Sequence, residues 1–201
     1  MPSAFGSSTG GPGLVERIIT GLPADMPVPI FIAQHLPPQF TPGYAAQIDR
    51  NGPLTALHAE DGLPVVPGTV YVGLGRQHLR IRRSKSPAQH RYEIEVSPEP
   101  QYLTFKPSAD ELFRSLVKHY GSKVLAIVMT GIGHDGTEGA RAVIEAGGVV
   151  LTQTAETCAV YGMPRSVVEA GYSTAALTPD DIRLAMMQLS PQHRATALLA
   201  G

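Results

Sequence analysis

The sequence predicts a single α/β domain, built on a doubly wound, mostly parallel sheet with helices on both faces and an antiparallel hairpin at one edge. Apolar, β-branched runs alternate along the chain with segments of helical periodicity, which is the pattern of successive βαβ units. Two further runs alternate apolar and polar residues, as strands with one exposed face do. The length of 201 residues is near that of one domain, so residues 1–201 are expected to form one unit.

Five runs are predicted to be strands of the main sheet, because each is apolar and bounded by turn residues. They cover residues 28–33, 70–74, 124–129, 149–152 and 173–177. A short extended piece is expected before Ser8. Residues 79–82 and 92–96 follow one another closely and are predicted to pair as the antiparallel hairpin. Residues 97–107 contain three prolines and no periodicity, which indicates a loop.

Three helices are predicted from apolar stripes with a spacing of three and four residues. The first begins near Pro12. The second has Ser108 as its N-cap, in a Ser-x-x-Glu capping box, and ends at Gly121. The third begins at Thr178, which is followed by a proline and two acids. The stripes are Leu14, Val15, Ile18, Ile19 and Leu22; Leu112, Phe113, Leu116, Val117 and Tyr120; and Ile182, Ala185, Met186 and Leu189.

The charge balance argues against several kinds of partner. Sixteen basic and 17 acidic residues give a formal net charge of -1, so no overall field attracts nucleic acid, which is not an expected partner. A run of basic residues alternates with apolar ones and contains Arg80, Arg82 and Arg83. We interpret these arginines as the solvent-exposed face of a strand. No apolar run approaches the ~18 residues that cross a bilayer, so membrane insertion is not expected.

A cytoplasmic location is expected from the cysteine content and the N-terminal residues. Cys158 is the only cysteine, so an intrachain disulfide cannot form. The first residues lack the basic and apolar regions of a secretory leader. Neither a metal nor a cofactor is expected, because the sequence has no H-E-x-x-H motif and no cysteine pair.

Polar residues follow three of the predicted strands, at the edge where open parallel sheets bind ligands. Ser8 follows the short N-terminal strand, His35 follows residues 28–33, and Asp135 follows residues 124–129. A serine nucleophile needs a base to take its proton, and the base needs an acid to orient it, so these side chains are a candidate triad. His134 could compete as the base, but it cannot readily be oriented by its neighbour Asp135, and His35 is preferred.

The glycine-rich loop around Ser8 leaves two interpretations open. Residues 6–11, GSSTGG, precede a predicted helix whose N–H groups and positive end would stabilise an oxyanion formed at Ser8. The same arrangement is typical of a phosphate-binding turn, although the P-loop lysine and the dinucleotide-binding G-x-G-x-x-G pattern are absent. From the spacing alone, nucleophile and phosphate site have nearly equal merit.

Seven short motifs add information that spacing does not supply. They are GSSTGG at 6–11, QHLP at 34–37, EDG at 60–62, PGTVY at 67–71, PSADELF at 107–113, TGIGHDG at 130–136 and YGMPR at 161–165. In this order they resemble the catalytic domain of the CheB family of chemotaxis receptor methylesterases, over about residues 6–189. The resemblance implies Ser8 as the nucleophile, His35 as general base and acid, and Asp135 as the residue that orients His35. It also implies oxyanion contacts from the backbone N–H groups of Thr9 and Ile132.

The resemblance implies a substrate and a mechanism as well. The substrate would be a γ-glutamyl methyl ester on the cytoplasmic helical bundle of methyl-accepting chemotaxis receptors. An acyl-enzyme would form with release of methanol, and deamidation of receptor glutamines would pass through the same intermediate. The receiver domain that usually accompanies the family's catalytic domain is not expected within this chain. The alternative is a non-catalytic module that keeps the fold and binds receptors or other partners.

The chain also departs from the family pattern. Ser7 stands where the family usually has alanine, and Ile132 stands where it commonly has methionine. Phe105 and Lys106 replace a usual His-Arg pair, and the whole stretch from 102 to 106 is unlike the family. Substrate contacts are therefore expected to differ in this loop.

Overall fold

The computed structural model describes residues 1–86 and 89–188 of the chain. The strands of the main sheet are β1 (Ser3–Ser7), β2 (Ile30–Gln34), β3 (Thr55–His58), β4 (Thr69–Val72), β7 (Leu125–Val128), β8 (Val149–Gln153) and β9 (Ala175–Leu177). A hairpin consists of β5 (His78–Arg83) and β6 (Tyr92–Ser97). The helices are α1 (Pro12–Thr20), α2 (Thr41–Asn51), α3 (Ala109–Tyr120), α4 (Thr137–Glu145), α5 (Met163–Glu169) and α6 (Pro179–Met187), with a short 3₁₀ turn η1 (Ala155–Thr157).

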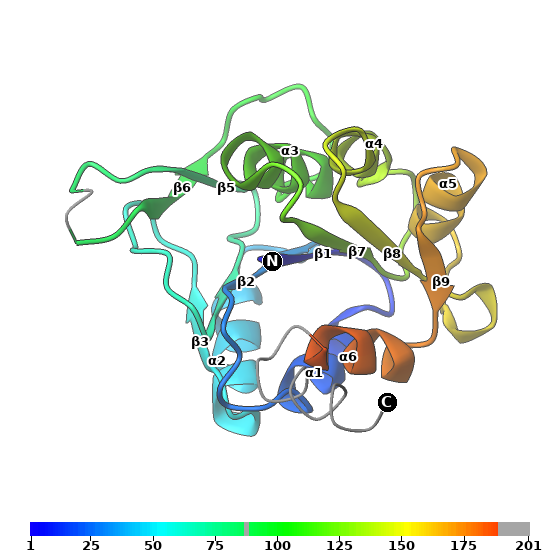
Figure 1. Ribbon diagram of the computed structural model, residues 1–201, viewed down its shortest axis with the longest axis horizontal. Coiled ribbons are helices and arrows are strands. Elements are labelled where there is room, and N and C mark those ends of the chain that lie inside the picture. Colours follow the sequence, from blue (N-terminus) through cyan, green and yellow to red (C-terminus); the bar gives the residue numbers. More distant parts are fainter. Residues whose placement is uncertain (87–88, 189–201) are drawn as a thin grey trace.

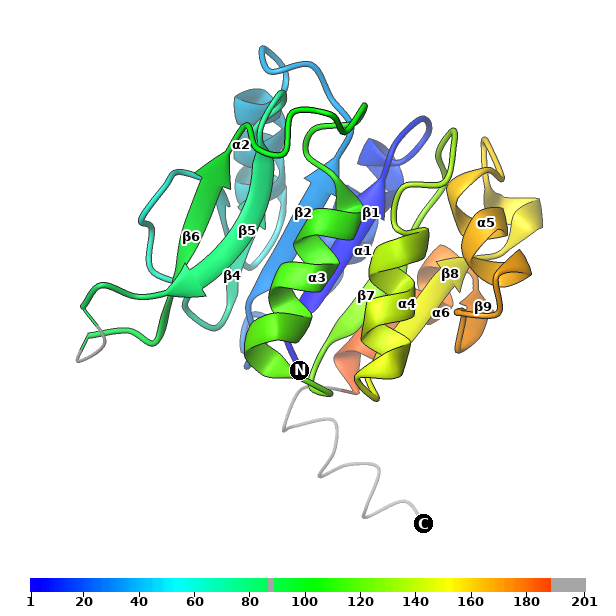
Figure 2. The same cartoon turned by 90° about the horizontal axis from the view of Figure 1, so that it is seen from above.

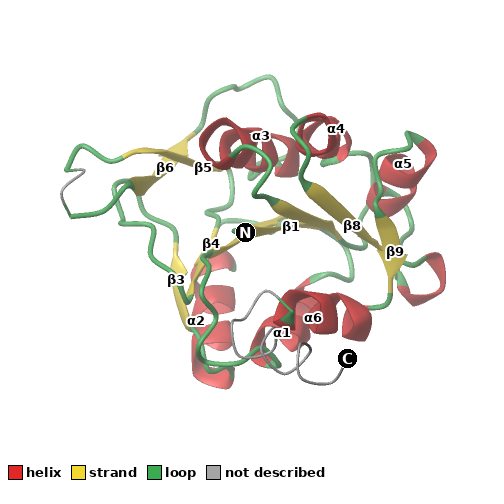
Figure 3. Ribbon diagram, viewed as in Figure 1, coloured by secondary structure: helices red, strands yellow, loops and turns green. Residues whose placement is uncertain are grey.

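Within the described residues, seven strands form one parallel sheet in the order β3-β4-β2-β1-β7-β8-β9 (Figure 1). Helices α3, α4 and α5 lie on one face, and α1, α2 and α6 lie on the other. Figure 3 separates the helices and the strands of these layers by colour. The predicted doubly wound α/β class is therefore confirmed, because the crossover helices cover both faces of a parallel sheet.

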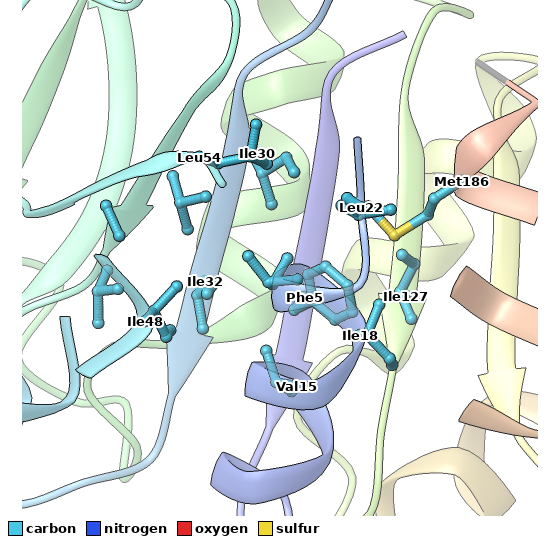
Figure 4. Close-up of a cluster of buried hydrophobic side chains, with 14 of the residues drawn as sticks. Phe5, Val15, Ile18, Leu22, Ile30, Ile32, Ile48, Leu54, Ile127 and Met186 are labelled. Atoms are coloured by element: carbon cyan, nitrogen blue, oxygen red, sulfur yellow. The ribbon is translucent and has the colours of Figure 1, made fainter. Parts of the chain in front are cut away.

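The central strands are apolar on both faces, as a sheet covered on both sides requires. In β1, Phe5 belongs to the core under α1, whereas its neighbour Ala4 belongs to the core under α3. Figure 4 shows Phe5 packed beside Ile18 of α1 and Ile127 of β7. The side chains of Ala4, Phe5, Ile18 and Ile127 are each at most 1% exposed. Each large side chain buried in this way stabilises the fold by about 1.5–3 kcal/mol.

The two predicted N-cap residues, Ser108 and Thr178, make N-cap hydrogen bonds. The hydroxyl of Ser108 accepts a hydrogen bond from the N–H of Glu111 at 3.3 Å, and that of Thr178 accepts one from the N–H of Asp181 at 3.2 Å. The capping box of α3 is incomplete, because the carboxylate of Glu111 pairs with Arg80 at 3.0 Å instead of returning to the N-cap. Leu189, the last residue of the third predicted stripe, lies outside the described residues.

The hairpin forms a sheet of its own and does not extend the main sheet. In the antiparallel ladder of β5 and β6, Ile81 lies opposite Ile94, and both are buried against α3. The N–H of Ile81 also donates to the hydroxyl of Ser115 on α3 at 3.1 Å. The arginines alternate with these residues, and Arg80 pairs across the ladder with Glu95 at 2.9 Å.

Four elements of the structure carry too little local pattern to be predicted. Helix α2 has a proline and a glycine in its first turn, and α5 has only 7 residues. Strand β3 is an edge strand with only one buried side chain, and the N-cap residue before α4 is Gly136, with φ 100°. Tertiary packing decides such segments. Among the described residues, no helix is long and apolar enough to span a membrane.

Candidate active site

The loops that follow β1, β2 and β7 meet at one end of the sheet (Figure 2). These strands are neighbours and run parallel. The N–H of His35 donates to the carbonyl oxygen of Ser7 at 2.9 Å, and the N–H of Ser8 donates to that of Thr130 at 3.0 Å. Backbone hydrogen bonds thus continue past the strand ends and hold the three predicted site segments side by side.

His35 and Asp135 are in direct contact. Nε2 of His35 lies 2.8 Å from Oδ2 of Asp135, and the two side chains are 8% and 7% exposed. An ionised carboxylate can only accept a hydrogen bond, so Nε2 carries the proton. In the neutral imidazole the other nitrogen, Nδ1, is then the acceptor. Nδ1 is buried and has no hydrogen-bond partner among the described residues.

The N-terminus of α3 holds the Asp135 carboxylate. Oδ1 accepts from the hydroxyl of Ser108 at 2.8 Å, and Oδ2 accepts from the N–H of Ala109 at 2.7 Å. Burial alone would raise the pKa of Asp135, but the hydrogen bond and charge of His35, with those two donors, outweigh it and hold the pKa below its usual value. The positive end of a helix favours the same ionised form. Asp135 is therefore an oriented anion.

A second carboxyl, that of Asp110, lies beside Asp135 and behaves differently. Its Oδ1 accepts from the N–H groups of Gly136 and Gly139 at 3.0 and 2.6 Å, which connects α3 to the start of α4. Burial and the negative charge of Asp135 together raise the pKa of Asp110 to about 6. The two carboxyls thus have opposite shifts, set by which of them faces His35.

Ser8 is the first residue after β1, in a turn that is fixed by its own carbonyl group. That carbonyl accepts from Nε2 of Gln34 at 3.0 Å and from the N–H of Gly11 at 2.9 Å. Ser8 itself is 8% exposed, so only a small part of it reaches solvent. Helix α1 begins directly after this turn and directs its N-terminus at the same region.

The loop after β7 approaches Ser8 closely. A Cβ atom added at Gly131 would lie 2.7 Å from Cβ of Ser8, so only glycine allows this contact. The next residue is Ile132, and neither its N–H nor that of Thr9 donates to an acceptor among the described residues. Two amide donors without an acceptor among the described residues therefore lie in the loop of Ser8 and in the loop that contacts it, and an oxyanion site is built from such donors.

The structure separates the two candidate bases. The imidazole of His35 contacts Asp135, whereas His134 is exposed. The backbone carbonyl of His134 accepts a hydrogen bond from the N–H of Thr137 at 3.1 Å. Among the described residues, no group of three or more His, Cys, Asp or Glu side chains could hold a metal ion. The arrangement thus offers a hydroxyl, an oriented imidazole and amide donors. The catalytic role of each residue stays a prediction.

Two contributors to the site were not assigned to it from the sequence. Ser108 was predicted only as a helix cap, yet its hydroxyl also donates to Asp135. Phe105 was noted only as a departure from the family pattern, yet its ring stacks on His35 with centroids 4.4 Å apart. A cleft of about 140 Å³ beside Asp135 is lined in part by both residues. Their position just before α3, whose N-terminus meets the site, is the signal that could have pointed to them.

Comparison with known proteins gives a consistent result. A family model described as CheB methylesterase matches residues 3–186. A protein-glutamate methylesterase/protein-glutamine glutaminase of Oleidesulfovibrio alaskensis is 40% identical over 184 residues, which are 92% of this chain and 49% of that protein. One of Caulobacter vibrioides is 42% identical over 178 residues, which are 88% of this chain and 50% of that protein. The chain therefore spans about half the length of these curated relatives.

A solved structure agrees in fold as well as in sequence. The CheB methylesterase catalytic domain of Thermotoga maritima superimposes with a TM-score of 0.88 at 37% identity, covering 94% of this chain and 97% of that one. The resemblance that the seven motifs carried is confirmed by the family model, the relatives and this structure together. The chain belongs to the CheB methylesterase family.

Proposed function

We propose that this domain hydrolyses γ-glutamyl methyl esters on the cytoplasmic helical bundle of chemotaxis receptors, with Ser8 as nucleophile. The observation that carries the proposal is the buried His35–Asp135 pair, 2.8 Å apart, at the strand end next to that of Ser8. The similarity to methylesterases, which is strong over residues 3–186, supports the choice of reaction. We place this activity in the cytoplasm, where that bundle lies.

In the proposed mechanism, Nδ1 of His35 takes the proton of Ser8. Nε2 is already engaged by Asp135, and Nδ1 is the nitrogen left without a partner among the described residues. Oγ of Ser8 attacks the ester carbonyl carbon while its proton passes to Nδ1. The Asp135 carboxylate stabilises the imidazolium that results, and the N–H groups of Thr9 and Ile132 bind the oxyanion.

The tetrahedral intermediate then collapses to an acyl-enzyme. The bond to the methoxy oxygen breaks, and His35 gives its proton to that oxygen, so that methanol leaves. A water molecule attacks the acyl carbon, His35 takes its proton and returns it to Oγ of Ser8, and a free glutamate is released. A glutamine side chain would give the same acyl-enzyme with loss of ammonia, which accounts for the deamidation that we also propose.

Two assays test this function. A fluorophosphonate probe should label the wild-type domain, and Ser8→Ala should abolish labelling and methanol release from methylated receptor membranes. Ser122→Ala, an exposed serine in the turn before β7, is the matched control and should leave both signals unchanged. Equal labelling of Ser8→Ala and wild type would remove Ser8 from the mechanism. Labelling of the wild-type domain without methanol release would support Ser8 as a reactive nucleophile but contradict receptor methyl esters as its substrate.

A further inference from the structure

The segment between β6 and α3 lies over the proposed base. Figure 2 shows this connection at the same end of the sheet as the ends of β1 and β2. Both ends of this segment are hydrogen-bonded to residues 76–80, which comprise the end of the loop after β4 and the first half of β5. The carbonyl oxygens of Glu99 and Pro100 accept from Arg80 at 2.9 Å and from Nε2 of His78 at 3.3 Å, and that of Lys106 accepts from the N–H of Arg76 at 3.1 Å.

Phe105 lies in this fastened segment with its ring flat against His35. The two ring centroids are 4.4 Å apart and the planes differ by 3°. The ring also lies beside the loop after β7, because a Cβ atom added at Gly133 would be 3.6 Å from Cε2 of Phe105. Phe105 thus stacks on the base and also lies beside the loop that holds Ile132.

This contact supplies a constraint that the Asp135 hydrogen bond does not. The hydrogen bond at Nε2 holds one atom of the imidazole, and the remaining freedom of the ring is rotation about its χ1 and χ2 bonds. A flat aromatic neighbour that is held by its own backbone opposes rotation of the ring towards it, and so restricts the direction of Nδ1. Misplacement of a reacting group by about 1 Å lowers a rate by on the order of a hundredfold, so the constraint is large enough to matter.

We infer that Phe105 is a positioning residue, which aligns Nδ1 of His35 with Ser8 by stacking. The inference rests on the proposed function, because it assumes that His35 takes the proton of Ser8. Phe105 has no ionisable group, so it acts only through its shape and its attachment. The residue types that can replace it are therefore flat aromatic ones.

Four variants test the inference with the fluorophosphonate probe, which is small and needs no receptor docking. Phe105→Ala should lower the maximal rate of Ser8 labelling by about ten- to a hundredfold, with little change in the probe concentration at half-maximal rate. Phe105→Tyr should stay within about twofold of wild type, and Phe105→Leu, which is apolar but not flat, should fall between them. Phe40→Ala is the matched control, since Phe40 is 58% exposed, and should label as wild type does.

Each outcome decides between the inference and its alternatives. Wild-type rates in Phe105→Ala, or an equal loss in Phe105→Tyr and Phe105→Ala, would overturn the positioning role while leaving the function intact. If Phe105→Ala does not unfold cooperatively, the comparison of Tyr and Leu carries the test. Undiminished labelling of Ser8→Ala would instead mean that the proposed function has failed.

Discussion

The hydroxyl of Ser108 donates to Oδ1 of Asp135 at 2.8 Å while it accepts from the N–H of Glu111 at 3.3 Å. One hydroxyl thus caps α3 and holds the carboxylate that contacts His35. The capping role of Ser108 can be separated from its role in positioning Asp135, because Thr178 caps α6 in the same way and α6 lies on the other face of the sheet from α3.

Ser108→Ala should lower both stability and reactivity. Loss of the cap should reduce the free energy of unfolding by about 1 kcal/mol. Loss of a donor to the buried Asp135 should lower the fluorophosphonate labelling rate by about tenfold. Urea unfolding and labelling kinetics measure the two effects. Thr178→Ala should show the stability loss alone, and an equal drop in its labelling rate would contradict a specific role for Ser108.

Sequence patterns predicted the parts of the fold whose local signals are strong. The runs around Ile30 and Ile127 are apolar because the sheet is covered on both faces, and Ser108 and Gly121 mark the two ends of α3 by their own conformations. Ser8, His35 and Asp135 could be proposed as a site because each lies in the segment that follows one of three neighbouring strands. What sequence patterns could not supply was the contact between Phe105 and His35, which depends on where a long loop folds back.

Asp110 should make stability depend on pH. Its pKa is about 6 in the folded protein, above the value of about 4 expected for an unfolded aspartate. Between these values the folded state binds more protons than the unfolded state, so stability contributed by the neutral carboxyl is lost as pH rises from about 4 to about 6. Above about pH 6 both states are deprotonated at this group, so the stability lost through Asp110 no longer changes with pH.

Asp110→Asn should remove this dependence while keeping the oxygen that accepts from Gly136 and Gly139. The free energy of unfolding of the variant, relative to that of wild type, should rise by about 1–3 kcal/mol between about pH 4 and pH 6 and stay constant above pH 6. Chemical denaturation at several pH values measures the difference. A difference that stays flat over this range would show that Asp110 does not titrate as proposed.

Ser7→Ala should stabilise the protein. The hydroxyl of Ser7 is buried at the end of β1 and has no hydrogen-bond partner among the described residues. Removal of an unpaired buried hydroxyl should raise the free energy of unfolding by about 1 kcal/mol. Ser115→Ala is the matched control, because its hydroxyl accepts from the N–H of Ile81, and it should lose about 1 kcal/mol. Destabilisation of both variants would refute the prediction for Ser7.

Gly131→Ala should damage the site through a steric contact. The added Cβ would lie 2.7 Å from Cβ of Ser8 and would also press on the sulfur of Met163, so Ser8 and the loop of Ile132 must move apart. We expect a labelling rate at least about a hundredfold lower and a stability loss of about 1–3 kcal/mol. Gly43→Ala is the control, since a Cβ on this residue of α2 meets nothing within 4 Å and should stabilise the helix by about 0.5–1 kcal/mol. Normal labelling of Gly131→Ala would mean that the loop can retreat without disturbing Ser8, and the free N–H of Ile132 would then not be needed for the reaction.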